Sequence, residues 1–514
     1  MKTAARELRA YQCFSFAGGL DVKTSPLTLA NRKKQDRLTL ARNMVYSVSG
    51  GVSKRFDQET YNTTTLGATV VITGGKLFRH SNGTDYNVCG TDDGRLVRLN
   101  TDGTTTNLAT GLTTGRRWSF DVYNDLLVCC NGADAPRKYD GTTVALLGGS
   151  PPSTARVVAH HGNRVFMLDQ TQLSRLTWSA LNNEEDYTTP NNAGSTPVAE
   201  NDGSNCIGLV PSINELIILK GTRPYRLQGT SPSTFTIADI VPTTGSVGAA
   251  GFQGNVFALN NVQYLATSGI TNLMTTQQFG DLKESFISDK IARYFEPGTD
   301  YTVSLNQLHL AAGVYDAQNG RLMWGVDTDG NAQNDTLLVY DTYTKGWSIW
   351  PSQSCASLWI VRNAANGREE VFMGGYDGFV RVLNRDVSTN TIDGYAKHIS
   401  HLNAAGIEKS PRYIYLYFSE EGNYSVAVDT KFDFGRSGGQ TYTASLLAGS
   451  KTLGVDWTMG VDPLGKKDQI VKRIDVSGLG EFLEIGVRNT AAGQPFTWLG
   501  YEVLWRPRRL VRRG

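Results

Sequence analysis

The stretch from Thr84 to Gly111, TDYNVCGTDDGRLVRLNTDGTTTNLATG, alternates short apolar runs with turns of the Asp-Gly type. Tight turns favour both residues, because Gly tolerates positive φ and an Asp side chain bonds the backbone two residues further on. The Val, Leu, Tyr and Thr residues between the turns favour strands. The stretch therefore predicts short antiparallel strands joined by tight turns. We assign the Asp residues of these and similar Asp-Gly pairs to turns: Asp93, Asp102, Asp140 and Asp377.

The same pattern continues from about residue 69 to residue 390, with weak internal repeats. Gly90–Asn100 (GTDDGRLVRLN) resembles Gly374–Asn384 (GGYDGFVRVLN), and Val157–Asp169 resembles Ala249–Asn261. Short strands that repeat at intervals of tens of residues, with Gly-Asp turns between them, predict a β-propeller. A stack of unrelated β-sandwiches is the alternative interpretation.

One segment inside this region has helical rather than strand periodicity. Gly280–Pro297 (GDLKESFISDKIARYFEP) spaces its apolar residues along one helical face. Asp281 is a candidate N-cap with Glu284 three residues later, and Pro297 ends the segment. We predict a packing helix inserted in the propeller. Its apolar face comprises Leu282, Phe286, Ile287, Ile291, Tyr294 and Phe295.

From about residue 406 onward, apolar and polar residues alternate, as in YSVAVDTKFDF and FTWLGYEVLWR. This period of two is typical of antiparallel strands with one buried face, and six or more such strands predict a β-sandwich. We therefore expect an all-β chain: an irregular β-propeller with an inserted helix, and a C-terminal antiparallel β-sandwich-like domain. The expected divisions are an N-terminal arm (1–60), the propeller (61–390) and the C-terminal domain with its basic tail (391–514).

The 514-residue chain has a net charge of +2 that is distributed unevenly. Residues 1–60 carry 11 Lys and Arg against 5 Asp and Glu, and the last twenty residues carry 5 Arg against 1 Glu. The ends are therefore basic and the remaining body is mildly acidic. We expect no secretory signal and no bilayer-spanning run, and therefore synthesis in the cytoplasm.

Little in the sequence points to catalysis. The six Cys are scattered, which predicts buried free thiols rather than a disulfide scaffold or a zinc site. The six His are equally scattered, and no P-loop, HExxH or GxSxG motif is present. We therefore predict a protein that is not an enzyme, with no cofactor and no metal.

The segment from Phe14 to Phe56 combines two Gly pairs, Gly18-Gly19 and Gly50-Gly51, with Pro26 between them. Such residues permit tight backbone approach and interrupt regular elements, so we expect an arm that folds back on itself. At the other end, the tail RPRRLVRRG has two interpretations. It is either a solvated, mobile terminus or a contact for phosphates or an acidic neighbouring subunit. The residues concerned are Arg506, Arg508, Arg509, Arg512 and Arg513.

The opening of the chain resembles that of the tail nozzle, or tail hub, proteins of short-tailed bacteriophages, which include the tail tubular and DNA-stabilisation proteins. The matching residues occur in order through the first 60 positions: Gly18, Gly19, Leu20, Asp21, Pro26, Ala41, Asn43, Gly51, Lys54 and Arg55. The segment Arg32–Arg37 is more basic than this family pattern. The propeller body and the β-rich end also fit the resemblance.

The resemblance implies a structural virion protein, assembled in the host cytoplasm, whose six copies form a ring below the portal-adaptor. The ring would continue the channel for DNA ejection, help to retain the packaged genome without reading its sequence, and anchor tail fibres or a needle. It implies no membrane insertion. We expect an acidic channel surface, which would repel DNA. The residues expected to dock neighbouring subunits are Gly18, Gly19, Leu20, Asp21, Pro26, Asn43, Lys54 and Arg55.

The alternative function is a phage or bacterial β-propeller that binds or cleaves host-surface polysaccharide. Such a site needs exposed aromatic platforms next to pairs of acidic residues. Five Trp residues could supply platforms, although packing in strand cores explains them equally: Trp178, Trp324, Trp347, Trp350 and Trp359. A generic bacterial propeller scaffold is the third interpretation.

Overall fold

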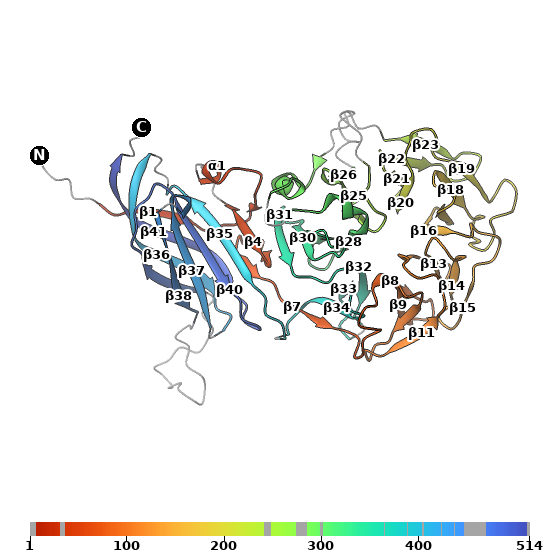
Figure 1. Ribbon diagram of the computed structural model, residues 1–514, viewed down its shortest axis with the longest axis horizontal. Helices are drawn as coiled ribbons and strands as arrows, with labels where there is room; N and C mark the ends of the chain where they lie inside the picture. Colours follow the sequence, from red (N-terminus) through yellow and green to blue (C-terminus); the bar gives the residue numbers. More distant parts are fainter. Residues whose placement is uncertain are drawn as a thin grey trace, which may run out of the picture. The chain divides into compact units, whose positions relative to one another are not determined.

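The computed structural model in Figure 1 divides the chain into two compact units. Unit 1 comprises Met1–Gln58, Val339–Pro351 and Asn384–Gly514, and unit 2 comprises Glu59–Leu338 and Ser352–Leu383. The structure describes residues 7–30, 36–240, 248–273, 285–298, 302–363, 365–387, 389–402, 406–422, 424–435, 437–446 and 469–510.

Unit 2 is a β-propeller made of consecutive antiparallel sheets. The first two sheets are formed by β8 (Ile72–Arg79), β9 (Asp85–Thr91), β10 (Leu96–Leu99) and β11 (Thr105–Ala109), and by β12 (Ser119–Tyr123), β13 (Leu126–Cys130), β14 (Arg137–Tyr139) and β15 (Val144–Leu146). The third and fourth are formed by β16 (Ala155–His161), β17 (Arg164–Asp169), β18 (Arg175–Trp178) and β19 (Gly194–Pro197), and by β20 (Cys206–Pro211), β21 (Leu216–Lys220), β22 (Pro224–Gln228) and β23 (Thr236–Asp239).

The remaining blades complete the series. The fifth is formed by β24 (Asn255–Ala258), β25 (Asn261–Ala266), β26 (Gly269–Asn272) and β27 (Ser285–Phe286). The sixth contains β28 (Ala312–Asp316), β29 (Arg321–Val326) and β30 (Thr336–Asp341). The seventh contains β32 (Ser357–Arg362), β33 (Glu369–Gly374), β34 (Val380–Arg385) and, as its fourth strand, β7 (Asp57–Thr60).

The innermost strands of these seven blades contact one another in sequence, from β8 through β12, β16, β20, β24 and β28 to β32. β32 in turn contacts β8, so the ring is closed. The last blade contains strands from both ends of the propeller sequence, since Tyr61 N–H donates to Val380 O at 2.8 Å. A ring closed in this way leaves only short, protected sheet edges. The predicted propeller is therefore confirmed, with seven blades in the described residues.

The predicted turns also have the expected chemistry. Asp102 Oδ1 accepts a hydrogen bond from Thr104 N at 2.9 Å, and Asp140 Oδ1 accepts one from Thr142 N at 2.8 Å. Asp377 accepts one from Phe379 N at 3.3 Å, and Asp93 is bonded by Thr91 and Arg95. These aspartates stabilise the turns between strands.

The predicted inserted helix is shorter than expected and is not an α-helix. A 3₁₀ helix, η2 (Asp289–Phe295), buries Ile291, Tyr294 and Phe295, three of the predicted apolar positions. Phe286 instead belongs to β27, because it pairs with Thr271 of β26 and completes the fifth blade. Asp281, Leu282 and Glu284 lie outside the described residues. A second 3₁₀ helix, η3, spans Leu305–Leu310.

Unit 1 contains two larger sheets that are mainly antiparallel, as predicted for the C-terminal region, with one short parallel pairing between Ile349 and Arg42. One has the order β39 (Gln469–Asp475), β36 (Ile407–Ser419), β41 (Thr497–Leu510), β6 (Val52–Lys54) and β5 (Met44–Tyr46), with β1 (Arg9–Cys13) also paired to β41. The other includes β31 (Gly346–Pro351), β4 (Leu40–Arg42), β35 (Gly394–Ser400), β40 (Leu483–Asn489), β37 (Ser425–Phe432) and β38 (Ser437–Ser445). The shorter elements are β2 (Gly19–Leu20), α1 (Pro26–Ala30), β3 (Arg37–Leu38) and η4 (Asp433–Gly435).

The N-terminal arm is part of this sandwich and not a separate segment. β4 pairs with β35, β6 pairs with β41, and β1 pairs with β41 over its whole length. We expected an arm over 1–60 and a C-terminal domain over 391–514, whereas the compact unit combines both with 339–351. Local sequence periodicity cannot reveal this arrangement, because strand pairing joins segments that are hundreds of residues apart.

The six cysteines are buried free thiols, as predicted. Cys129 and Cys130 lie in β13 and belong to different hydrophobic clusters on the two faces of the blade. In the described part of the chain, no helix is long and apolar enough to cross a bilayer.

The close approach of Gly19 to β31 gives a direct test of the arm. Gly19 has φ +65°, and a Cβ at this position would lie 2.4 Å from the Gly346 Cα. We expect Gly19→Ala to lower the free energy of unfolding by about 3 kcal/mol or more, because neither backbone can move freely. Chemical denaturation followed by fluorescence measures the change.

Gly406→Ala is the matched control, since Gly406 also has positive φ (+70°) in unit 1, but a Cβ added there would have no atom within 4 Å. It should cost only about 1 kcal/mol, the contribution of the φ angle alone. Equal losses in the two variants would contradict tight packing of the arm.

Candidate functional site

The residues that carry the sequence resemblance lie within unit 1 and contact residues of the same unit. Lys54 is buried, and its Nζ donates to Asn489 Oδ1 at 2.9 Å and to Ala491 O at 2.7 Å. Burial lowers the pKa of Lys54 to about 8. The side chain therefore joins the arm to the end of β40 and to the loop after it through two hydrogen bonds.

Asn43 and Arg55 form a second buried pair. Asn43 adopts φ +52°, a conformation that Asn tolerates better than most residues. Its Oδ1 accepts a hydrogen bond from Arg55 Nε at 2.9 Å, and its Nδ2 donates to Asp393 O at 3.1 Å. The Arg55 guanidinium lies over the Trp350 ring, with 5.1 Å between Cζ and the ring centroid. This pair connects the arm to β31 and to the start of β35.

The first glycine pair and Asp21 shape the turn before α1. Gly18 N donates to Asp36 O at 2.9 Å, and Leu20 is fully buried. The Asp21 carboxylate accepts hydrogen bonds from Thr24 N and from Arg37. Burial alone would raise the pKa of Asp21, but these partners lower it. Pro26 is the first residue of α1, where its missing N–H has no helical acceptor to satisfy.

These eight residues therefore have structural roles inside one chain. The side chains of Asp21, Asn43, Lys54 and Arg55 are buried and form hydrogen bonds within unit 1 itself. Their expected docking to a neighbouring subunit stays a prediction. Of the C-terminal arginines, Arg506, Arg508 and Arg509 lie in β41, and Arg512 and Arg513 lie outside the described residues.

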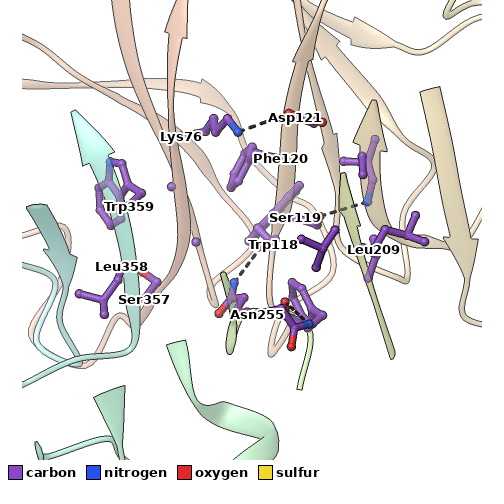
Figure 2. A pocket seen from close by; sticks show the side chains of 18 of the residues that line it. Lys76, Trp118, Ser119, Phe120, Asp121, Leu209, Asn255, Ser357, Leu358 and Trp359 are labelled. Carbon is purple, nitrogen blue, oxygen red and sulfur yellow. Dashed lines mark hydrogen bonds and ion pairs between the residues drawn. The ribbon is translucent and has the colours of Figure 1, made fainter. Parts of the chain in front are cut away.

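Unit 2 contains a cavity of about 530 Å³ on the propeller axis, lined mainly by innermost strands. Figure 2 shows Lys76 on β8, Asp121 on β12 and Trp359 on β32 around this space. Nothing in the sequence gives a reason to select Lys76 or Asp121, because only the closed ring places the innermost strands next to one another.

Three ionisable side chains meet at the cavity. Lys76 Nζ lies 3.3 Å from Asp121 Oδ1, and His160 Nδ1 lies 2.8 Å from Asp121 Oδ2. Burial would raise the pKa of Asp121, but the Lys76 charge and the hydrogen bonds from His160 lower it to about 2. The hydrogen bond to Asp121 raises the pKa of His160, although partial burial opposes the shift. Asp121 is therefore an anion held between the Lys76 ammonium group and the His160 imidazole ring.

A polar network connects opposite sides of the ring. Gln253, which precedes β24, donates through Nε2 to Thr73 O of β8 at 2.6 Å and to Trp118 O at 3.0 Å. Its Oε1 accepts from Arg117, and Arg117 donates to Ala356 O at 2.9 Å. Because the fifth blade lies opposite the first two in a seven-membered ring, these bonds cross the axis. The propeller axis is therefore spanned by side chains next to the cavity.

This arrangement offers little support for catalysis. Asp121 is the one carboxylate among the described residues that line the cavity, and it is already paired. Glycoside hydrolysis requires two carboxyl groups flanking the scissile bond. The five Trp residues considered as platforms are at most 6% exposed and pack in strand cores. Among the residues that the structure describes, no group of three His, Cys, Asp or Glu could hold a metal ion.

The sequence matches no protein-family model and no curated protein. Among solved structures, the chain is similar to the extracellular domain of a one-component system from B. thetaiotaomicron, with 13% identity and a TM-score of 0.45. That match covers 65% of this chain and 41% of the other. YCF48 from Cyanidioschyzon merolae matches with 13% identity and a TM-score of 0.41, over 64% of this chain and 98% of YCF48. Our description of the propeller rests on its closed ring of blades.

The Asp121 cluster predicts a specific pH dependence. The pKa of His160 should lie above 6.5 in the native chain, and Asp121→Asn should lower it by removing the anion. The stabilisation of the fold by protonated His160 should be complete below pH 6.5 and should be lost as the pH rises through the native pKa of His160. The stabilisation of the fold by ionised Asp121 should be present above about pH 4 and should be lost as the pH falls to about 2. Proton NMR of the His160 ring measures the titration.

We expect Asp121→Asn to lower the free energy of unfolding by about 1–3 kcal/mol, since it removes the charge of a largely buried carboxylate that bonds to both Lys76 and His160. Asp85→Asn is the control, because Asp85 pairs with the exposed Arg79 on the surface and should change stability by less than about 0.5 kcal/mol. An unshifted His160 pKa in Asp121→Asn would contradict the assignment.

The cross-axis network should contribute to ring stability. Gln253→Ala removes the hydrogen bonds to Thr73, Trp118 and Arg117 at once, leaving buried polar groups without partners. We expect a loss of about 2–4 kcal/mol in urea denaturation. Gln172→Ala, in the turn before β18, serves as the comparison and should be nearly neutral; similar losses would argue against the network.

Proposed function

We propose that this protein is the tail nozzle subunit of a short-tailed bacteriophage. In this proposal, six copies form a ring below the portal-adaptor, continue the DNA ejection channel, help to retain the packaged genome and anchor fibres or a needle. The protein would act in the virion tail after assembly in the host cytoplasm. The ordered arm residues from Gly18 to Arg55 support the proposal through their resemblance to this family.

The observation that carries the proposal is the division of charge between the two units. Unit 1 contains 29 Lys and Arg residues and 19 Asp and Glu residues, which gives a net charge of +10. Unit 2 contains 21 Lys and Arg residues and 29 Asp and Glu residues, which gives a net charge of −8. These charges add to the +2 of the whole chain. A head-to-tail ring requires two different, mutually attractive surfaces on each copy. A basic unit and an acidic unit supply that complementarity.

The propeller chemistry supports a structural role. The ionisable side chains at the cavity pair with one another, since the Asp121 carboxylate contacts both Lys76 and His160. The axis is crossed by the bonds of Gln253, so a single propeller does not serve as a DNA conduit. In the proposed nozzle, the channel lies between copies of the chain and not within one propeller.

The native mass of the purified protein, measured alone and with a portal-adaptor complex, tests the proposal. We expect a hexamer that caps the complex, and we expect sodium chloride at about 0.5 M to weaken contacts between copies, because salt screens attraction between exposed charges. A chain that stays monomeric in both conditions would overturn the proposal. Depolymerisation of host polysaccharide by the purified chain would instead favour the alternative function.

A further inference from the structure

A pocket of about 540 Å³ in unit 1 brings together two arginines from opposite ends of the C-terminal region. Arg412 comes from β36 and Arg508 from the end of β41, and Gln440 of β38 and Ser477 of the loop after β39 also line the pocket. Arg412 and Arg508 are both exposed. The sequence singled out Arg508 as a possible phosphate contact but gave no reason to select Arg412.

The backbone of β36 positions Arg412. The pairing of β36 with β41 shifts register between Pro411 and Tyr413, so Arg412 is the extra residue of a β-bulge. Pro411 has no N–H to contribute to the ladder, which makes a bulge less costly here. The Arg412 carbonyl accepts a hydrogen bond from Val476 N at 3.0 Å, which holds the bulge against the next loop. A bulge redirects its side chain, and here the residue lines the pocket.

Contacts within unit 1 hold the other lining residues of the pocket in place. Gln440 Nε2 donates to Ser477 Oγ at 3.1 Å, so the two polar side chains hold each other. Gly478 lies directly on the Phe432 ring, since a Cβ there would come within 2.1 Å of a ring carbon. The glycine therefore permits the loop to pack closely on an aromatic floor. These contacts produce a defined concave site and not two isolated surface arginines.

The charge of the pocket is uncompensated. None of the described lining residues is a carboxylate, and neither Arg412 nor Arg508 pairs with a carboxylate among the described residues. Arg508 Nη2 donates a long hydrogen bond to Ser410 Oγ at 3.5 Å. By contrast, Arg473 pairs with Asp475 at 3.2 Å, and Arg488 pairs with Asp393 at 2.7 Å. Neither pocket arginine is neutralised by a carboxylate of the described residues, so most of their N–H donors remain available for an anionic ligand.

We propose that this pocket binds a phosphate group, with Arg412 and Arg508 as its two cationic contacts. Guanidinium groups match the geometry of phosphate oxygens through paired N–H donors, and two of them balance the charge of a phosphate dianion. Ser410, Gln440 and Ser477 also line the pocket and add neutral polar groups. The phosphate belongs either to a small phosphomonoester or to the backbone of nucleic acid.

Calorimetric titration of the full chain with inorganic phosphate tests this site. We expect saturable binding, with affinity reduced at least about tenfold in Arg412→Ala and in Arg508→Ala, because each loses a charge-assisted contact. Arg412→Lys should retain part of the affinity, since it keeps the charge but loses the paired donors. Arg473→Ala is the control and should bind phosphate as the unmodified chain does.

Competition by a duplex DNA of about 20 base pairs distinguishes the two sources of phosphate. Displacement of inorganic phosphate by the duplex, lost in Arg412→Ala, identifies the nucleic-acid backbone, and failure to displace it identifies a small phosphomonoester. Absence of phosphate binding, or binding unchanged in both alanine variants, would overturn the proposal. Both substitutions are at exposed positions and should leave the unfolding midpoint nearly unchanged. The result is independent of ring assembly, because the titration does not require hexamers.

Discussion

The pairing of the N-terminal arm with the C-terminal strands is the constraint on which this structure depends. β4 pairs with β35, and β6 and β1 pair with β41; both partner strands come from beyond residue 390. Each of these pairings satisfies backbone groups that would otherwise be buried without partners. Lys54 and Arg55 then find their acceptors inside the unit. The chain continues directly from the arm into the closing strand of the propeller, so a single N-terminal segment completes both units.

Closure also determines what the propeller can do. Seven innermost strands place Lys76, Asp121 and His160 at one cavity, and they allow Gln253 to bond across the axis. Both arrangements satisfy buried polar groups and leave no acid pair among the cavity's described residues. The two units also differ in charge, +10 on one and −8 on the other. In the proposed ring, this difference would supply the attraction between neighbouring copies.

The proposed phosphate site illustrates how local irregularity creates specificity. A regular ladder through Pro411 and Arg412 would keep the arginine in the normal alternation of the strand. The bulge instead places it in a pocket with Arg508, close to Phe432 and the glycine that packs on its ring. Natural strands use such extra residues to redirect side chains near functional sites. The two arginines of the pocket and the net positive charge of unit 1 both favour an anionic ligand or surface.

The sequence alone determined the strand-rich propeller, the β-sandwich, the Asp-Gly turns and the buried thiols, because each depends on residues close together in the chain. It also predicted the apolar residues that η2 buries. Phe286 was predicted to lie on the same helical face but belongs to β27, because its pairing with Thr271 outweighs the local helical periodicity. Only the tertiary structure showed the number of blades, the pairing of the arm with the C-terminal strands, the contacts of Asp121 with Lys76 and His160, and the pocket that Arg412 and Arg508 both line. Each of these joins residues distant in sequence, and such contacts form through strand pairing and ring closure, which leave no periodic signal in a single sequence.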